Sequence, residues 1–319
     1  MNRRQYLVRT GAGAVTLTAL AGCLDRSEDA SSQPVSDRTG ERALDRAVGT
    51  LNLAAVALAV DEDALEDVER DAFDSGEPTE LIDDARDHLE TAATELPSDR
   101  DADVETLNTY ADVLEQLIAV TAVVTDEALA DAVDDVVAAI DGEGDREAAA
   151  ATLDEQTTEI DAARTTYDEA LADVRSFGDR FEELTSLEPA QLEEGVAPLG
   201  DAVASLATIG DGLESMLDGT GSLERGRDHF ENGAYDRARK AFAAAETAFE
   251  SARTAFDADN PPAGFADRVG TAHCQATRLG EAAGDFRAAA SAAADGDRIT
   301  AREKRNDGED ALEAAGRCA

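Results

Sequence analysis

Residues 189–217, PAQLEEGVAPLGDAVASLATIGDGLESML, show most clearly how this chain folds. Pro189 stands where a helix can begin, because a proline at the first helical position gives up no intrahelical hydrogen bond. After it, apolar residues recur at alternating steps of four and three, the spacing that places side chains on one face of an α-helix. The stretch is therefore predicted to be a long amphipathic helix. Its apolar stripe consists of Leu192, Val196, Leu199, Val203, Leu206, Gly210, Leu213 and Leu217.

The same spacing continues through most of the chain, and the alternation typical of strands is missing. Apolar stripes occur in residues 82–96, 104–124, 129–140, 153–184 and 265–290. We predict an all-α protein of about eight to ten helices, either an up-and-down helical bundle or a short irregular α-solenoid. Breaks rich in Gly, Pro, Asp and Ser separate the stripes at residues 76–78, 97–99, 142–144, 188–189, 219–221, 233, 260–262 and 295–297.

The first 23 residues, MNRRQYLVRTGAGAVTLTALAGC, have the composition of an export signal. Arg3 and Arg4 precede a weakly apolar run over residues 7–21, which is shorter than the roughly 20 residues that a membrane-spanning helix needs. The run ends in the tetrad LAGC at residues 20–23. This segment resembles a twin-arginine signal peptide with a lipobox. The resemblance implies cleavage after residue 22, a lipid on Cys23, and a domain held on the outer face of the cell membrane.

The rest of the chain divides into a tether and two helical parts. Residues 1–22 are the predicted signal peptide, and residues 23–38 are interpreted as the lipidated cysteine followed by a disordered tether with little to bury. The Gly, Thr and Ser residues at 219–222 mark the best internal boundary. We therefore expect an N-terminal helical bundle over residues 39–219 and a C-terminal helical module over residues 220–319.

The chain is strongly acidic, with 71 Asp and Glu against 28 Lys and Arg and a formal net charge of −43 at pH 7. Only Lys240 and Lys304 are lysines. Nucleic acid is excluded as a partner, because polyanions bind to basic surfaces. Together with the export signal, this composition resembles that of exported lipoproteins of salt-loving archaea. Molar salt shortens the Debye length to ~3 Å and makes such a charge tolerable.

Cysteine usage allows one disulfide. With Cys23 assigned to the lipid, Cys274 and Cys318 remain, and an exterior location favours their pairing. A bridge across this separation would stabilise the fold by on the order of 4 kcal/mol, through the lost entropy of the unfolded chain. Spacing alone does not establish proximity, so two unpaired thiols remain the alternative.

One stretch has the character of a known repeat. Residues 226–249, GRDHFENGAYDRARKAFAAAETAF, resemble a single tetratricopeptide repeat. The resemblance implies a helical hairpin that forms part of a partner-binding module with a peptide groove. The chain departs from the family because one aromatic comes a place late, at Phe230, and no second copy follows at the period of about 34 residues. The residues that carry the resemblance are Gly226, Phe230, Gly233, Tyr235, Ala238 and Phe242.

The motifs of common catalytic and cofactor sites are missing from the sequence. There is no P-loop and no Gly-x-Ser-x-Gly elbow, and no Glu-x-x-His pair of a di-iron bundle. Asp99, Asp101 and Asp103 begin like a calcium loop, but the sixth position is Val104 instead of glycine. We interpret this run as a solvated helix start and expect no catalytic residue, no metal and no cofactor.

These observations favour a non-enzymatic interaction or scaffold protein at the cell surface, attached to the membrane through Cys23, with a protein or peptide as partner. The alternative is a solute- or cation-capturing lipoprotein associated with transport, because an acidic field attracts cations. An enzyme ranks third, because helical enzymes usually show a metal or nucleophile cluster. A concave pocket with converging polar groups would favour capture, and a long groove would favour partner binding.

The export signal gives a direct prediction. Replacing Cys23→Ser should release the protein into the medium, because the lipid is the expected attachment, and Arg3→Lys with Arg4→Lys should stop export. Mass spectrometry of the membrane-extracted protein should find Cys23 as a lipid-modified N-terminus. A mature protein that still begins at Met1 would contradict both expectations.

Overall fold

The computed structural model describes residues 35–58, 73–140, 142, 144–257 and 263–318. The predicted signal residues Arg3 and Arg4, the lipidation site Cys23 and most of the tether lie outside these residues. Ten α-helices and one 3-10 turn form the described part, which contains no strand, so the all-α prediction is confirmed. The elements are α1 (Val35–Leu58), α3 (Gly76–Glu95), η1 (Ser98–Arg100), α4 (Asp101–Val124), α5 (Glu127–Ile140), α6 (Arg146–Ser176), α7 (Asp179–Thr185), α8 (Pro189–Glu231), α9 (Tyr235–Asp257), α10 (Ala263–Ala294) and α11 (Arg298–Ala315).

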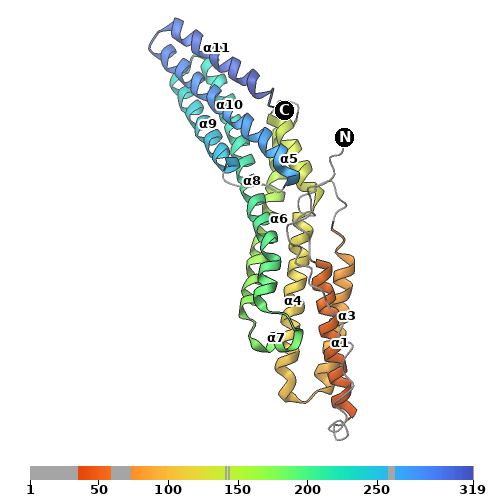
Figure 1. Cartoon of the computed structure of the whole chain (residues 1–319). Helices are drawn as coiled ribbons and strands as arrows, with labels where there is room; N and C mark the ends of the chain where they lie inside the picture. The colour runs from red at the N-terminus through yellow and green to blue at the C-terminus, as the bar shows by residue number, and fades with distance from the viewer. Residues whose placement is uncertain (1–34, 59–72, 141, 143, 258–262, 319) are drawn as a thin grey trace, which may run out of the picture.

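The helices form an elongated molecule with two halves (Figure 1). In one half α1, α3, α4 and α6 pack side by side with the first part of α8. In the other half α8, α9, α10 and α11 follow one another, each packed on the next. The 43 residues of α8 span about 65 Å and belong to both halves. No helix in the described residues has the length and apolarity that a bilayer crossing requires.

Local signals in the sequence set most of the helix ends. Pro189 opens α8 inside a capping box formed by Glu188 and Gln191. The carboxylate of Asp297 caps α11 by accepting hydrogen bonds from two backbone N–H groups. The α8–α9 turn contains Gly233 at a φ of +70°, a conformation that side chains disfavour. The predicted breaks at 97–99, 188–189, 233 and 295–297 are therefore confirmed, whereas residues 260–262 lie outside the described part.

Glycines of α8 hold the phenylalanine rings of α9. A Cβ atom added to Gly212 would lie 2.5 Å from a ring carbon of Phe256, and one added to Gly219 would lie 2.7 Å from a ring carbon of Phe249. Gly226 takes the ring of Phe242 in the same way. Two steps of seven residues along α8 thus match two steps of seven in the opposite direction along α9, which fixes the register of this antiparallel pair. We call these six residues the Gly–Phe seam.

The helix break predicted at residues 219–221 is wrong. Helix α8 runs through this stretch, and Gly219 and Thr220 are buried within it. The glycine is needed there because the ring of Phe249 occupies the space of a side chain. The Thr220 hydroxyl donates to the carbonyl of Met216, so it is satisfied inside the helix. The boundary placed between residues 219 and 220 therefore falls within a helix that the two parts share.

The apolar stripe of residues 153–184 predicts one long helix, and this prediction is also wrong, because α6 ends at Ser176 and α7 begins at Asp179. Gly178 lies at the break with an extended backbone. The turn stacks the rings of Phe177 and Phe181 with their centroids 4.2 Å apart. The ring of Phe181 then meets the edge of the buried Tyr110 at 5.1 Å. Packing of these three aromatics therefore outweighs the helical spacing of the sequence.

Asp103 is not the solvated residue that the sequence suggested, because its side chain is only 3% exposed. Arg180 of α7 donates to it at 2.6 Å, and Arg100 donates from the preceding turn. The hydrogen bond from Arg180 is the largest cause that holds the pKa of Asp103 below its usual value, against the opposing effect of burial. The ion pairs attach α7 to the start of α4.

Helix α1 begins earlier than predicted, at Val35 inside the expected tether. Asp37 lies in its first turn, where a negative charge is favourable.

Replacing a glycine by alanine usually stabilises a helix, and the Gly–Phe seam predicts the opposite effect at its own glycines. Gly219→Ala should lower the free energy of unfolding by about 1 to 2 kcal/mol, because displacement of the Phe249 ring outweighs the better helix propensity of alanine. The matched control is Gly195→Ala in the same helix, where an added Cβ meets nothing within 4 Å. That change should stabilise by about 0.5 to 1 kcal/mol. Urea unfolding in molar KCl measures both, and an equal gain at both positions would contradict the seam.

Candidate functional site

The tetratricopeptide-like residues form the hairpin of α8 and α9, and most of their side chains pack between its two helices. Gly226 receives the ring of Phe242, and Ala238 is fully buried. Phe230 and Tyr235 pack with ring centroids 5.4 Å apart across the turn at Gly233. These side chains hold the two helices together. The hairpin therefore uses these residues for its own packing, and a surface open to solvent in this module is formed by other residues.

A groove of about 570 Å³ lies between α9 and α10, one helix further along the module. Its floor exists because α10 has glycines at Gly280 and Gly284, one turn apart, so that no side chain fills the space above them. An added Cβ at Gly280 would lie 3.6 Å from the Cβ of Phe249, which is an ordinary contact. The groove is lined by Glu246, Phe249, Glu250, Arg253, Ala276, Thr277, Gly280, Glu281, Gly284 and Asp285.

The walls of this groove are acidic, with four carboxylates against one arginine. Each carboxylate accepts from a basic side chain of the protein itself. The hydrogen bond from Arg253 lowers the pKa of Glu250, and hydrogen bonds to Asp307 and then Asp285 raise the pKa of Lys304. The four pairs are Glu250–Arg253 at 2.7 Å, Glu281–Arg278 at 2.8 Å, Glu246–Arg287 at 3.1 Å and Asp285–Lys304 at 3.1 Å.

These pairs decide which ligands suit the groove. All four are at least partly open to water, where an exchangeable ion pair contributes about 1 kcal/mol or less. A guanidinium or ammonium group from outside can therefore replace an internal partner at small cost. A bare metal ion would need several carboxylates released together. Within the described residues, no group of three or more His, Cys, Asp or Glu side chains is arranged to hold a metal.

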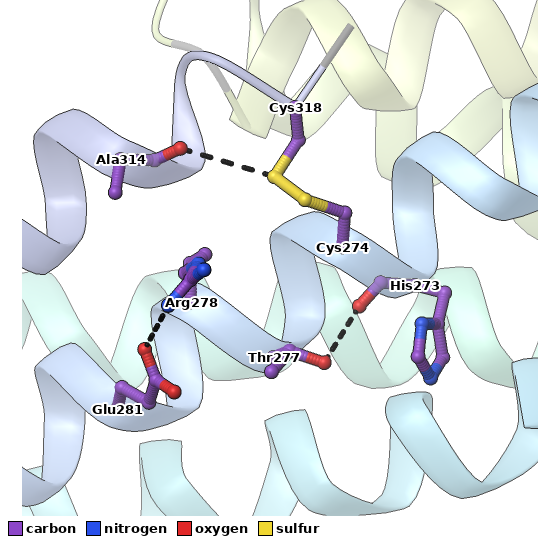
Figure 2. The surroundings of a disulfide bond; sticks show 7 residues. All are labelled: His273, Cys274, Thr277, Arg278, Glu281, Ala314 and Cys318. Atoms are coloured by element: carbon purple, nitrogen blue, oxygen red, sulfur yellow. Dashed lines mark hydrogen bonds and ion pairs between the residues drawn. A yellow bond between two sulfur atoms is a disulfide. The ribbon is translucent and has the colours of Figure 1, made fainter.

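A disulfide joins Cys274 of α10 to Cys318 beyond the end of α11 (Figure 2). Their Cα atoms are 5.7 Å apart. Thr277, which lines the groove, and Arg278 lie one turn after Cys274, and Glu281 lies one turn further along the same helix (Figure 2). The bridge therefore fixes the end of the wall that forms one side of the groove.

Helix α11 has little apolar surface of its own to hold it against α10. Its buried residues are Ala301, Gly308 and Ala315, which are small and spaced by seven. Gly308 lies under the ring of Phe286, 3.1 Å from the position of an added Cβ. Ala311 and Leu312 add only partly buried contacts to these three small residues, so the disulfide reinforces a modest apolar attachment.

Comparisons with known proteins give no family for this chain. No family model, no curated protein and no solved structure matches it significantly. The groove was not predicted from the sequence. A signal for it was present in Gly280 and Gly284, which directly follow Leu279 and Ala283 of the apolar stripe and place two glycines one turn apart beside it.

The thin packing of α11 predicts a local effect of the disulfide. In the variant Cys274→Ser with Cys318→Ser, amide hydrogen exchange of α11 should accelerate at least tenfold, because a released helix end opens more often. Exchange in the Gly–Phe seam should stay unchanged, and it serves as the internal control. Equal protection of α11 with and without the bridge would show that the small-residue contacts suffice.

Proposed function

We propose that this protein is a non-enzymatic interaction protein, held on the exterior face of the cell membrane by a lipid on Cys23, and that the groove between α9 and α10 receives a basic segment of a partner protein. The observation that carries the proposal is the groove itself: an open, acidic channel on a rigid helical module. The export signal and the lipobox in the sequence support the location.

The chemistry of the groove favours a peptide segment over a small solute. The groove lies between two helices and is partly open to solvent, whereas small-molecule sites usually enclose their ligand. The four carboxylates lie along both walls, which suits successive Arg or Lys side chains of one segment. The glycine floor exposes helix backbone and lets a chain approach closely.

The surroundings keep the groove in shape before a partner arrives. One wall, α9, is fixed in register by the Gly–Phe seam, and the other wall, α10, is fixed by the disulfide at Cys274. A preformed groove loses less conformational entropy on binding than a flexible surface does. A net charge of −43 on the chain would also attract a basic partner from a distance, although molar salt limits this to short range.

The groove can be filled without disturbing the fold. In Gly280→Gln with Gly284→Gln, each new Cβ would make only ordinary contacts at 3.6 Å, and the rest of each side chain would occupy the channel. The protein is cross-linked to its partner in cell-surface extracts in molar KCl, and the cross-linked partner is then recovered with it. We expect the filled variant to stay helical and to recover at least about tenfold less of this partner. The control is Gly270→Gln on the same helix, where an added Cβ meets nothing within 4 Å.

The readout is the difference between these two variants, measured by quantitative mass spectrometry of the cross-linked proteins. A partner that is retained by Gly270→Gln and lost by the filled groove supports the proposal. A partner recovered equally by both variants would place recognition elsewhere. Recovery of small solutes and no protein would replace the proposal with solute capture.

A further inference from the structure

The outward face of α1 differs from the rest of this acidic molecule. Successive residues of an α-helix are turned by about 100°, so the side chains of this face lie within a sector of roughly 80° around the helix axis. The sector is opposite the buried residues Ala47, Leu51 and Ala54. The first half of this sector is basic, and the second half is apolar and uncharged. We call it the α1 outer face, and it consists of Arg38, Arg42, Arg46, Gly49, Leu53 and Val56.

The three arginines of this face are exposed and spaced by four residues. Within the described part of the chain they form no salt bridge, whereas Arg253, Arg278 and Arg287 are paired with the carboxylates of the α9–α10 groove. Only Asp45 brings an acidic side chain to the edge of the same sector. The α1 outer face therefore carries a local positive charge on a chain whose net charge is −43.

The second half of the face exposes apolar side chains. No charged residue occurs between positions 47 and 58, although 31% of the chain is charged. Leu53 is 59% exposed and Val56 is 60% exposed. In the described residues, Ile299 is the one other large apolar side chain with this degree of exposure. A helix with basic residues beside exposed apolar ones is typical of a membrane surface contact.

The length of chain before α1 places this face near a membrane. Eleven residues lie between Cys23 and Val35, where α1 begins, and this length of chain reaches at most about 40 Å. We propose that the α1 outer face lies on the membrane, with the arginines bound to phosphates of anionic lipid headgroups and Leu53 and Val56 in the interfacial layer. The inference rests on the lipid anchor of the proposed function for bringing α1 to the membrane.

A lipid surface fits this face better than a second copy of the chain. Two copies would bring three arginines of each face together, and their acidic surfaces would repel. Arginine binds phosphate with two parallel hydrogen bonds, which remain effective at the short range that molar salt permits. Since α1 runs beside α3 and α4 along the length of its half of the molecule (Figure 1), this half would lie flat on the membrane.

The chain contains no tryptophan, so a single introduced one reports its own position. We would place Leu53→Trp and, as the control, Ile299→Trp in the full lipidated chain in molar KCl. The vesicles contain equal parts of phosphatidylglycerol and brominated phosphatidylcholine. Fluorescence at position 53 should shift to the blue and be quenched about twofold or more, because bromine lies in the acyl layer, and fluorescence at position 299 should not change.

A second set of variants tests the arginines. Adding Arg38→Gln, Arg42→Gln and Arg46→Gln to Leu53→Trp should abolish most of the quenching. Adding Arg227→Gln, Arg298→Gln and Arg302→Gln, which removes three other exposed arginines, should leave it unchanged. Equal losses from both sets would overturn the assignment of headgroup contacts to α1.

The remaining outcomes separate this inference from the proposed function. A chain that floats with the vesicles but is not quenched at position 53 keeps its anchor and overturns the membrane contact of α1. A blue-shifted signal at position 53 without vesicles also overturns the membrane contact, because the tryptophan is then already shielded from water. If the shift depends on protein concentration, a second copy of the chain covers position 53, and if it does not, another segment of the same chain does. A chain without lipid on Cys23 refutes the anchor of the proposed function. In that case, quenching at position 53 with excess vesicles still supports the membrane contact of α1, and no quenching overturns it.

Discussion

The close approach of α8 and α9 is the constraint on which the rest of the structure depends. Three glycines on one helix receive three phenylalanine rings from the other, at matching intervals of seven residues. Large rings can enter only where the facing residue has no side chain, so a slip of one residue would place a Cβ against every ring. A chain with 4% aromatic residues and no tryptophan obtains a unique register in this way from a small number of large contacts.

The same packing produces the candidate binding site. Phe249 belongs to both features, because its ring lies against Gly219 of α8 while its Cβ faces Gly280 on the floor of the groove. Glycine therefore has two roles in this half of the molecule. Where a ring fills the space, as at Gly219, it joins two helices, and where neighbouring atoms come no closer than ordinary contact, as at Gly284, it leaves a channel. The disulfide from Cys274 to Cys318 then holds the outer wall in place, because α11 buries little apolar surface.

The sequence was sufficient for the helices and insufficient for what lies between them. The stripe after Pro189 and the turn at Gly233 were predicted correctly, because periodicity and capping are local properties. Gly219 was misread as a break, since a glycine that ends a helix and one that admits a ring look alike until the facing helix is known. Asp103 was misread as solvated for the same reason, because its partner Arg180 is remote in sequence. The groove depends on which faces of α9 and α10 meet, and a single sequence does not state that.

A double-mutant cycle on Gly226 and Phe242 tests the central claim most directly, with the free energy of unfolding measured by urea in molar KCl. If the ring occupies the space left by the glycine, Gly226→Ala should be destabilising in the native background. In a Phe242→Leu background, where the smaller side chain leaves room, it should become neutral or stabilising, with a coupling energy of about 1 kcal/mol or more. Additive effects of the two substitutions would contradict the account, because they would show that the glycine and the ring do not share the same space.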